Sequence, residues 1–276
     1  MTRKSAALAL AVTALLWSVG GVFIKSVEWN PLAIAGARSG IAAVFLALAL
    51  GKPKIRLSWP LVGAAVSTAA CMLMFVTATR LTTAANAVML QYLAPIHVAL
   101  LAPRFLGEPT KRHDWAALAM ALCGMVLFFW EDVSPEGKLG ITLAVGSSFA
   151  FAGIPLFLRK LGGKGGQTEA VLLGNALLAL VCLPFYFQGG LPDAKGVGAL
   201  LILGVVQTGL AYFIYTKAVR HVNALPAILI PVIEPVLNPV WVFLFIGEKP
   251  SFTALLGGLV VLGAATMQGI FAARGR

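Results

Sequence analysis

One carboxylate, Glu234, lies near the middle of a long apolar stretch that covers residues 224–247. An ionisable residue at membrane depth is costly to bury, and such residues commonly mark a substrate or proton pathway. The spacing i, i+3, i+7, i+10 places four side chains of this stretch on one helical face: Pro231, Glu234, Asn238 and Trp241. We predict that this face lines a central cavity and contacts substrate. The alternative is a kinked packing helix in which Glu234 is neutral or paired.

Prolines interrupt the same stretch at Pro226, Pro231, Pro235 and Pro239. A proline inside a helix removes one donor and frees the carbonyl four residues earlier. Lipid cannot satisfy a freed carbonyl, so this backbone must face protein or a water-filled cavity. We therefore predict that Pro231, Pro235 and Pro239 serve as hinges, together with Pro95 in an earlier apolar stretch.

Polar and aromatic side chains in the other apolar stretches are candidates for completing the cavity. A tyrosine offers an apolar ring and one hydroxyl, which suits an amphipathic substrate, and methionine provides an adaptable apolar wall. Ordinary packing of the methionine and phenylalanine, and membrane-interface anchoring of Tyr215, remain alternatives. The candidates for substrate contact are Trp17, Met72, Phe75, Gln91, Tyr92, Gln207, Tyr212 and Tyr215.

Arg38 and His97 join Glu234 as candidates for a charge or proton relay. Histidine titrates near physiological pH, although a His97 bonded to a neighbouring helix is an equally good interpretation. Arg38 could attract a substrate carboxylate. However, Gly36 and Gly40 around it suit close helix packing, and intramembrane charges commonly pair internally. We predict a structural Arg38 that donates to backbone carbonyls at helix ends.

The composition indicates an all-α integral membrane protein. Hydrophobic residues make up 59% of the 276 residues and charged residues 11%, whereas soluble domains carry about 25% charged residues. The net charge of +11 does not indicate nucleic-acid binding, because the basic residues lie in short connections between apolar stretches. The three cysteines are isolated and form neither a disulfide framework nor a metal site, and we expect no cofactor.

Ten apolar stretches are predicted to cross the membrane. When the N-terminus is placed in the cytoplasm, 15 Lys and Arg fall in cytoplasmic segments and 5 in external ones, with Arg38 inside a span. This bias predicts cytoplasmic termini and a multi-pass protein of the bacterial inner membrane. The predicted spans are 5–24, 32–50, 58–79, 84–103, 114–130, 138–158, 168–187, 196–217, 224–246 and 252–272.

The chain also repeats itself. A shift of 140 positions aligns residues 80–108 with residues 220–248, so that a basic residue, a proline-broken span and a Gly-Glu pair recur. Each copy, 1–130 and 131–276, holds five predicted spans. Because five is odd, the second copy must be inverted, and inverted repeats around a central cavity are a transporter architecture. An old duplication retained only for packing is the alternative.

The tract from Ala87 to Gly107-Glu108, its partner ending at Gly247-Glu248, and the pair Pro31 and Arg38 resemble the EamA family of the drug/metabolite transporter superfamily. The resemblance implies a ten-helix basket with spans 3, 4, 8 and 9 around the cavity, and no ATP hydrolysis. Within the family the chain is similar to bacterial exporters of aromatic and other neutral amino acids. The resemblance also leaves the oligomeric state open, a monomer included.

We therefore predict a secondary transporter that exports small amphipathic metabolites by alternating access, with amino acids as the favoured substrates. The alternatives are a broad-specificity drug or metabolite efflux carrier, a channel and an intramembrane enzyme. The enzyme is disfavoured because the sequence lacks the short motifs of metalloproteases and serine hydrolases. The expected partners are a small-molecule substrate and the lipid bilayer.

Overall fold

The computed structural model describes residues 1–131, 135–162, 165–188, 190–246 and 251–274, and all the regular elements within these ranges are helical. The helices up to residue 128 are α1 Arg3–Ser18, α2 Gly20–Lys25, α3 Pro31–Leu50, α4 Trp59–Leu81, α5 Ala84–Gln91, α6 Ala94–Leu106 and α7 Arg112–Phe128. The later ones are α8 Lys138–Lys160, α9 Gln167–Val181, η2 Leu183–Phe185, α10 Ala194–Leu201, η3 Ile202–Leu210, α11 Ala211–Ala218, α12 Ala224–Leu229, η4 Ile230–Ile233, α13 Glu234–Ile246 and α14 Phe252–Arg274.

Helix is present in each of the ten predicted spans. Within the described residues, six helices are long and apolar enough to cross a membrane: 31–50, 59–79, 85–106, 138–160, 194–218 and 252–274. The others are shortened by breaks or early ends, as α1 ends at Ser18 and α9 at Val181. A crossing needs roughly 20 residues. The all-helical membrane class is thus confirmed, whereas the count of ten spans stays a prediction.

Helix ends follow local sequence signals. The Asn30 side chain accepts from the Leu32 amide at 2.9 Å, and Pro31 occupies the first position of α3. Asp193 caps α10 by accepting from the Gly196 amide at 2.7 Å. Gly107 ends α6 in the left-handed region at φ +71°, where a side chain would be strained. These signals place the connections where the sequence predicts them.

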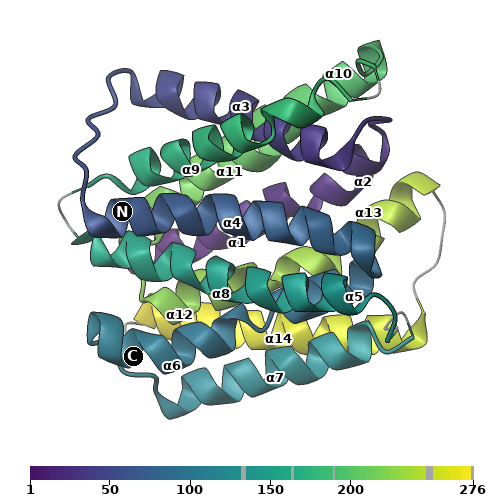
Figure 1. Ribbon diagram of the computed structural model, residues 1–276. Helices are drawn as coiled ribbons and strands as arrows, with labels where there is room; N and C mark the ends of the chain where they lie inside the picture. The colour runs from purple at the N-terminus through teal and green to yellow at the C-terminus, as the bar shows by residue number, and fades with distance from the viewer. Residues whose placement is uncertain (132–134, 163–164, 189, 247–250, 275–276) are drawn as a thin grey trace.

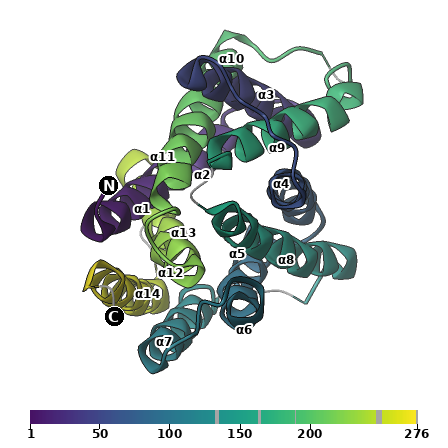
Figure 2. The ribbon, with the colours of Figure 1, turned by 90° about the vertical axis from the view of Figure 1, so that its left-hand side faces the viewer.

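Glycines let neighbouring helices approach closely. A Cβ on Gly257 of α14 would lie 2.4 Å from the Phe128 amide nitrogen of α7, and a Cβ on Gly153 of α8 would lie 2.4 Å from the Ser67 hydroxyl of α4. Small residues at such contacts are a common means of packing membrane helices. Figures 1 and 2 show the resulting pairs, α7 beside α14 and α4 beside α8.

Segments far apart in the sequence are interleaved around the bundle. α1 packs on α11 and α14, and α4 packs on α8 and α9. In the end-on view of Figure 2 the helices surround the middle of the bundle in a ring. The start of α1 and the end of α14 lie at the same end of the bundle, on the left of Figure 1.

Two helices break at corresponding positions. α5 ends at Gln91, and Tyr92 and Leu93 separate it from α6, whose second residue is Pro95. The 140-residue shift places these two residues on Val232 and Ile233, which lie in the 3-10 turn η4 between α12 and α13. Proline explains both breaks because it cannot donate to the preceding turn. The predicted interruption of both segments is therefore confirmed, whereas the Gly247-Glu248 pair lies outside the described residues.

A second irregularity was not predicted. Residues Ile202–Leu210 form the π-helix η3 between α10 and α11. Gly204 and Gly209 of this segment approach α3 so closely that a Cβ on either would collide with Ile41 or Phe45. π-Helical turns often occur at functional sites, and this one carries Gln207.

Candidate functional site

The two helix breaks meet through a hydrogen bond between their polar side chains. Tyr92, at the end of α5, donates its hydroxyl to Glu234 Oε2 at 2.7 Å. Tyr92 is buried and Glu234, the first residue of α13, is half-buried. These two residues are 142 positions apart in the chain. The carboxylate predicted from the sequence therefore lies at the junction of the two interrupted helices.

Arg38 of α3 reaches the same region and has no ionic partner within the described chain. Its guanidinium donates to Gln207 Oε1 at 3.5 Å and to Met72 Sδ at 3.2 Å. Nε is buried without a hydrogen-bond partner among the described residues. These contacts are side chains of η3 and α4, so the prediction that Arg38 donates to backbone carbonyls is wrong. Arg38 points between helices rather than along a helix end.

Arg38 and Glu234 influence each other electrostatically, although they do not form a salt bridge. The ion pairs of the described residues lie elsewhere, at Arg159–Glu108 and His113–Asp114. A guanidinium and a carboxylate that do not pair with each other keep hydrogen-bonding capacity for a third group. We call Arg38, Met72, Tyr92, Gln207 and Glu234 the central site.

Aromatic rings from three helices pack beside the central site. The ring centroid of Trp17 lies 5.2 Å from that of Tyr212, 5.5 Å from that of Tyr215 and 6.5 Å from that of Phe151. Tyr92 meets Phe151 edge to face at 6.1 Å. The Tyr215 hydroxyl is buried and has no hydrogen-bond partner among the described residues. The sequence predicted Trp17, Tyr212 and Tyr215 as candidates but missed Phe151.

Trp241 and Gln207 tie the central site to the break between α1 and α2. Trp241 Nε1 donates to Ser18 Oγ at 2.9 Å. Gln207 Nε2 donates to the Trp17 carbonyl at 3.5 Å, and its Oε1 accepts from Thr208 at 2.9 Å. Both predicted residues thus reach α1. The side chains of Asn238 and Pro239, also predicted, lie outside the described part of the structure.

Two other predicted residues, Gln91 and Phe75, have contacts of a different kind. Gln91 Nε2 donates to Cys71 Sγ at 3.4 Å, close to the central site. Phe75 packs with Ala78, Ala87 and Ala144 in a separate apolar cluster.

His97 contacts the neighbouring helix α8. Its Nε2 lies 2.9 Å from Ser148 Oγ, and its ring stacks on Phe149 with centroids 3.8 Å apart. The alternative interpretation of His97, bonded to a neighbouring helix, is therefore confirmed. None of its described contacts joins it to Glu234 or Arg38, and the relay role stays a prediction.

A second group of charged side chains joins three helices through hydrogen bonds. Glu108 Oε1 accepts from Arg159 Nε at 2.8 Å, and Glu108 Oε2 accepts from the Ala224 amide at 2.7 Å. Arg159 also donates to the Arg220 carbonyl at 3.1 Å. We call Glu108, Arg159 and these two backbone groups the Glu108 cluster. It joins the end of α6 to α8 and to the first residue of α12.

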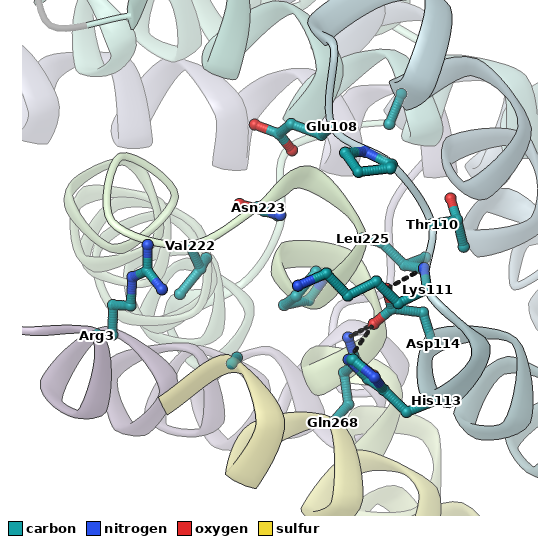
Figure 3. A pocket seen from close by; sticks show the side chains of 14 residues that line it. Arg3, Glu108, Thr110, Lys111, His113, Asp114, Val222, Asn223, Leu225 and Gln268 are labelled. Carbon is teal, nitrogen blue, oxygen red and sulfur yellow. Dashed lines mark hydrogen bonds and ion pairs between the residues drawn. The ribbon is translucent and has the colours of Figure 1, made fainter. Parts of the chain in front are cut away.

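A polar pocket of about 250 Å³ adjoins the Glu108 cluster. Figure 3 shows Glu108 and Asn223 on one side of it and Asp114, His113 and Gln268 on the other. Asp114 accepts from the Lys111 amide at 2.9 Å and from Gln268 Nε2 at 2.8 Å. Within the described residues, no group of three or more His, Cys, Asp or Glu could hold a metal ion here or elsewhere.

Comparisons with known proteins identify the family of the chain. The profile of the EamA-like transporter family matches residues 4–130 and again residues 138–268. The chain belongs to the EamA-like transporter family. It is therefore a transporter-family membrane protein with apolar helices, as the resemblance implied.

Relatives carry transporter names as well. A protein named "Uncharacterized transporter" from Archaeoglobus fulgidus is 25% identical over 263 residues, covering 92% of both chains. The "Uncharacterized transporter YwfM" of Bacillus subtilis is 28% identical over 220 residues, covering 75% of this chain and 74% of its own. "Protein RarD" of Escherichia coli is 26% identical and covers 58% of this chain and 54% of its own. One solved structure, titled "Crystal structure of protein", superposes with a TM-score of 0.84 at 20% identity over 98% of this chain and 99% of that one, which shows the fold alone.

The sequence did not identify Glu108 and Arg159 as interacting residues. Glu108 is notable in the sequence as part of a recurring Gly-Glu pair, and Arg159 is one of many basic residues in the connections between apolar stretches. The recurrence of Gly-Glu at the end of both proline-broken spans was the available signal. Cys71 and Ser18 gave no signal, because small residues of this kind are common in membrane helices.

Proposed function

We propose that this protein is a secondary transporter of the bacterial inner membrane that exports small amphipathic metabolites, with neutral and aromatic amino acids as its favoured substrates. The observation that carries this proposal is the Tyr92–Glu234 hydrogen bond, which brings two broken helices together at a polar junction inside the bundle. Transporters build substrate sites from discontinuous helices of this kind. Membership of the EamA-like family supports the same conclusion.

We infer that ten spans form two inverted five-helix repeats, 1–130 and 131–276. Three observations support this: the family profile matches twice, the helix breaks fall at positions related by the 140-residue shift, and both chain ends lie at one end of the bundle. The excess of Lys and Arg on that side of the predicted topology supports cytoplasmic termini.

Substrate would occupy the space between the central site and the aromatic rings. Glu234 and the carbonyls freed by proline would accept hydrogen bonds from an ammonium group. An apolar side chain would lie against Trp17, Tyr212 and Tyr215, since their rings are already gathered beside the site. Glu234 and Gln207 are only partly buried, which supports an interior that small molecules can enter.

Alternating access would follow from bending at the helix breaks. Pro95, Pro231 and Pro235 lie at the breaks. They would let α5 tilt separately from α6, and α12 separately from α13, and Pro239 would add a further point of bending. The Glu108 cluster would act as the cytoplasmic gate, because it holds the ends of α6, α8 and α12 together. Opening toward the cytoplasm would require these bonds to separate.

Counterflow in proteoliposomes tests the proposal. Vesicles loaded with one unlabelled amino acid or amphipathic drug are diluted into its labelled form, and uptake is followed across a panel of both compound types. We expect saturable uptake of at least one neutral or aromatic amino acid that protein-free vesicles do not show. Saturable uptake of drugs alone would favour the broad-specificity efflux carrier. Non-saturating flux would favour a channel, and no flux of any compound would contradict the transport proposal.

A further inference from the structure

Arg38 is a buried cation whose hydrogen-bonding capacity is largely unused. Arg38 is only 5% exposed. A guanidinium carries five N–H donors, yet the described contacts are one bond to Gln207 at 3.5 Å and one to Met72 at 3.2 Å. The first distance is long for a hydrogen bond, and a thioether is a weak acceptor. Nε has no partner among the described residues.

Burial of an unpaired charge is costly, and charged residues inside a membrane commonly mark a substrate or ion pathway. The described groups that act electrostatically on Arg38 are Tyr212, Cys71 and Glu234. Of these only Glu234 can carry a full negative charge at neutral pH, and it forms no salt bridge with Arg38. Its Oε2 is held by Tyr92 instead. The guanidinium therefore faces a site that lacks an anion in contact with it.

We infer that Arg38 binds the carboxylate of the transported molecule, and that Arg38 and Glu234 together select substrates carrying both an anionic and a cationic group. A planar guanidinium suits a carboxylate because two parallel N–H donors meet its two oxygens. The ammonium of the same molecule lies toward Glu234. Arg38 comes from the first repeat and Glu234 from the second, so one zwitterion bridges both. This assignment rests on the proposed transport function.

Competition in the counterflow assay tests the assignment. The probes are phenylalanine, leucine and threonine, each with the amine that lacks its carboxylate and the acid that lacks its amino group. In the wild type we expect the unlabelled amino acid to compete with uptake of the labelled one, and the amine to compete at least about tenfold more weakly. R38Q should weaken competition by the amino acid by at least about tenfold and leave competition by the amine unchanged. R38K should restore part of the affinity, since it keeps the charge without the bidentate geometry.

The control is R112Q, which removes an exposed arginine at the start of α7 and should leave both affinities unchanged. Thermal unfolding in detergent establishes that each variant is folded, and R38M serves as a second variant where R38Q does not fold. If a folded variant loses competition by the amino acid and by the amine to the same extent, Arg38 has a structural role and the inference is overturned. So would unchanged amino-acid affinity in R38Q, or a wild type that prefers the amine; in each case transport itself stands. A wild type that carries no probe compound at all would overturn the transport proposal and this inference with it.

Discussion

Arg38 and Arg159 are both arginines within the helical bundle, and they have opposite surroundings. Arg159 donates to the Glu108 carboxylate and to a backbone carbonyl, so its charge is paired and its donors are occupied. Arg38 is more deeply buried, yet its described partners are an amide oxygen and a sulfur. A charge pair closed within the chain stabilises one conformation. We propose that the charge of Arg38, which has no anion in contact with it among the described residues, is neutralised by the substrate carboxylate.

The two carboxylates differ in the same way. Glu108 uses both oxygens within the protein, one for Arg159 and one for the Ala224 amide. Glu234 is half-buried and receives one described bond, from Tyr92. The comparison therefore separates a charge pair that joins helices within the chain from the central site that we propose as the binding site.

Removal of Glu108 should have the largest effect on stability. E108A leaves Arg159 without its anion and the first amide of α12 without its acceptor. Breaking a buried ion pair costs about 3–5 kcal/mol, and partial exposure of this pair reduces the expected loss to about 2–3 kcal/mol. At roughly 2–4 °C per kcal/mol the apparent Tm in detergent should fall by about 4–12 °C. E28A, which alters an exposed carboxylate, should leave Tm within about 1 °C. An unchanged Tm in E108A would show that the Glu108 cluster does not hold the closed end.

Removal of the charge on Glu234 should affect transport rather than folding. E234Q keeps the shape and the bond from Tyr92 but loses the negative charge. We expect at least about a tenfold loss of counterflow, which corresponds to about 1.4 kcal/mol, with an unchanged Tm. Rates measured between about pH 5.5 and 8 should also change their pH dependence in the variant. Wild-type transport across this range in E234Q would assign Glu234 a structural role.

Loss of the Tyr92 hydroxyl should have an intermediate effect. Y92F removes one hydrogen bond to a charged group, which is worth about 1.5–3 kcal/mol, while the ring contact with Phe151 remains. Because Glu234 then loses its described donor, we expect substrate affinity to change several-fold and transport to persist. The matched control is Y186F. It removes a hydroxyl that donates to the Ala179 carbonyl at 3.4 Å and that does not belong to the central site. Identical behaviour of both variants would argue against a functional Tyr92–Glu234 pair.

The Trp241–Ser18 bond should matter least. S18A removes a neutral hydrogen bond of 2.9 Å, worth about 0.5–1.5 kcal/mol. A small fall in Tm with transport reduced by no more than a few-fold is the expected result, measured in the same two assays. A complete loss of transport in folded S18A would move the essential polar contact from Glu234 to the break between α1 and α2.

Much of the fold follows from the sequence, because apolar length and proline position have direct physical consequences. The breaks at Tyr92 and at Ile230–Ile233 were predicted from Pro95 and the prolines around Glu234. A proline does not by itself determine where a helix breaks, however. Pro155 lies inside the continuous helix α8, where packing against α4 and α5 outweighs the lost hydrogen bond.

The partners of the charged residues could not be predicted with the same ease. Hydropathy identifies Arg38 and Glu234 as exceptional, but their contacts depend on how helices from distant parts of the chain rotate against each other. Arg38 meets Gln207 across 169 positions, and Gln207 lies in the π-helix η3, in which side chains follow a different spacing from that of an α-helix. Nothing in residues 202–210 distinguishes that π-helix from an ordinary α-helix in the sequence. The incorrect prediction for Arg38 has this origin.

The most direct test of the account uses Cys71, a native probe that is buried beside the central site and bonded by Gln91. In a C123S/C182S background, a membrane-impermeant thiol reagent is applied from the cytoplasmic side with and without a transported amino acid. We expect that E108A accelerates modification of Cys71 from this side, and that the amino acid slows it. Equal modification rates in the presence and absence of E108A and of the amino acid would contradict the claim that the Glu108 cluster closes access to a substrate site at the centre.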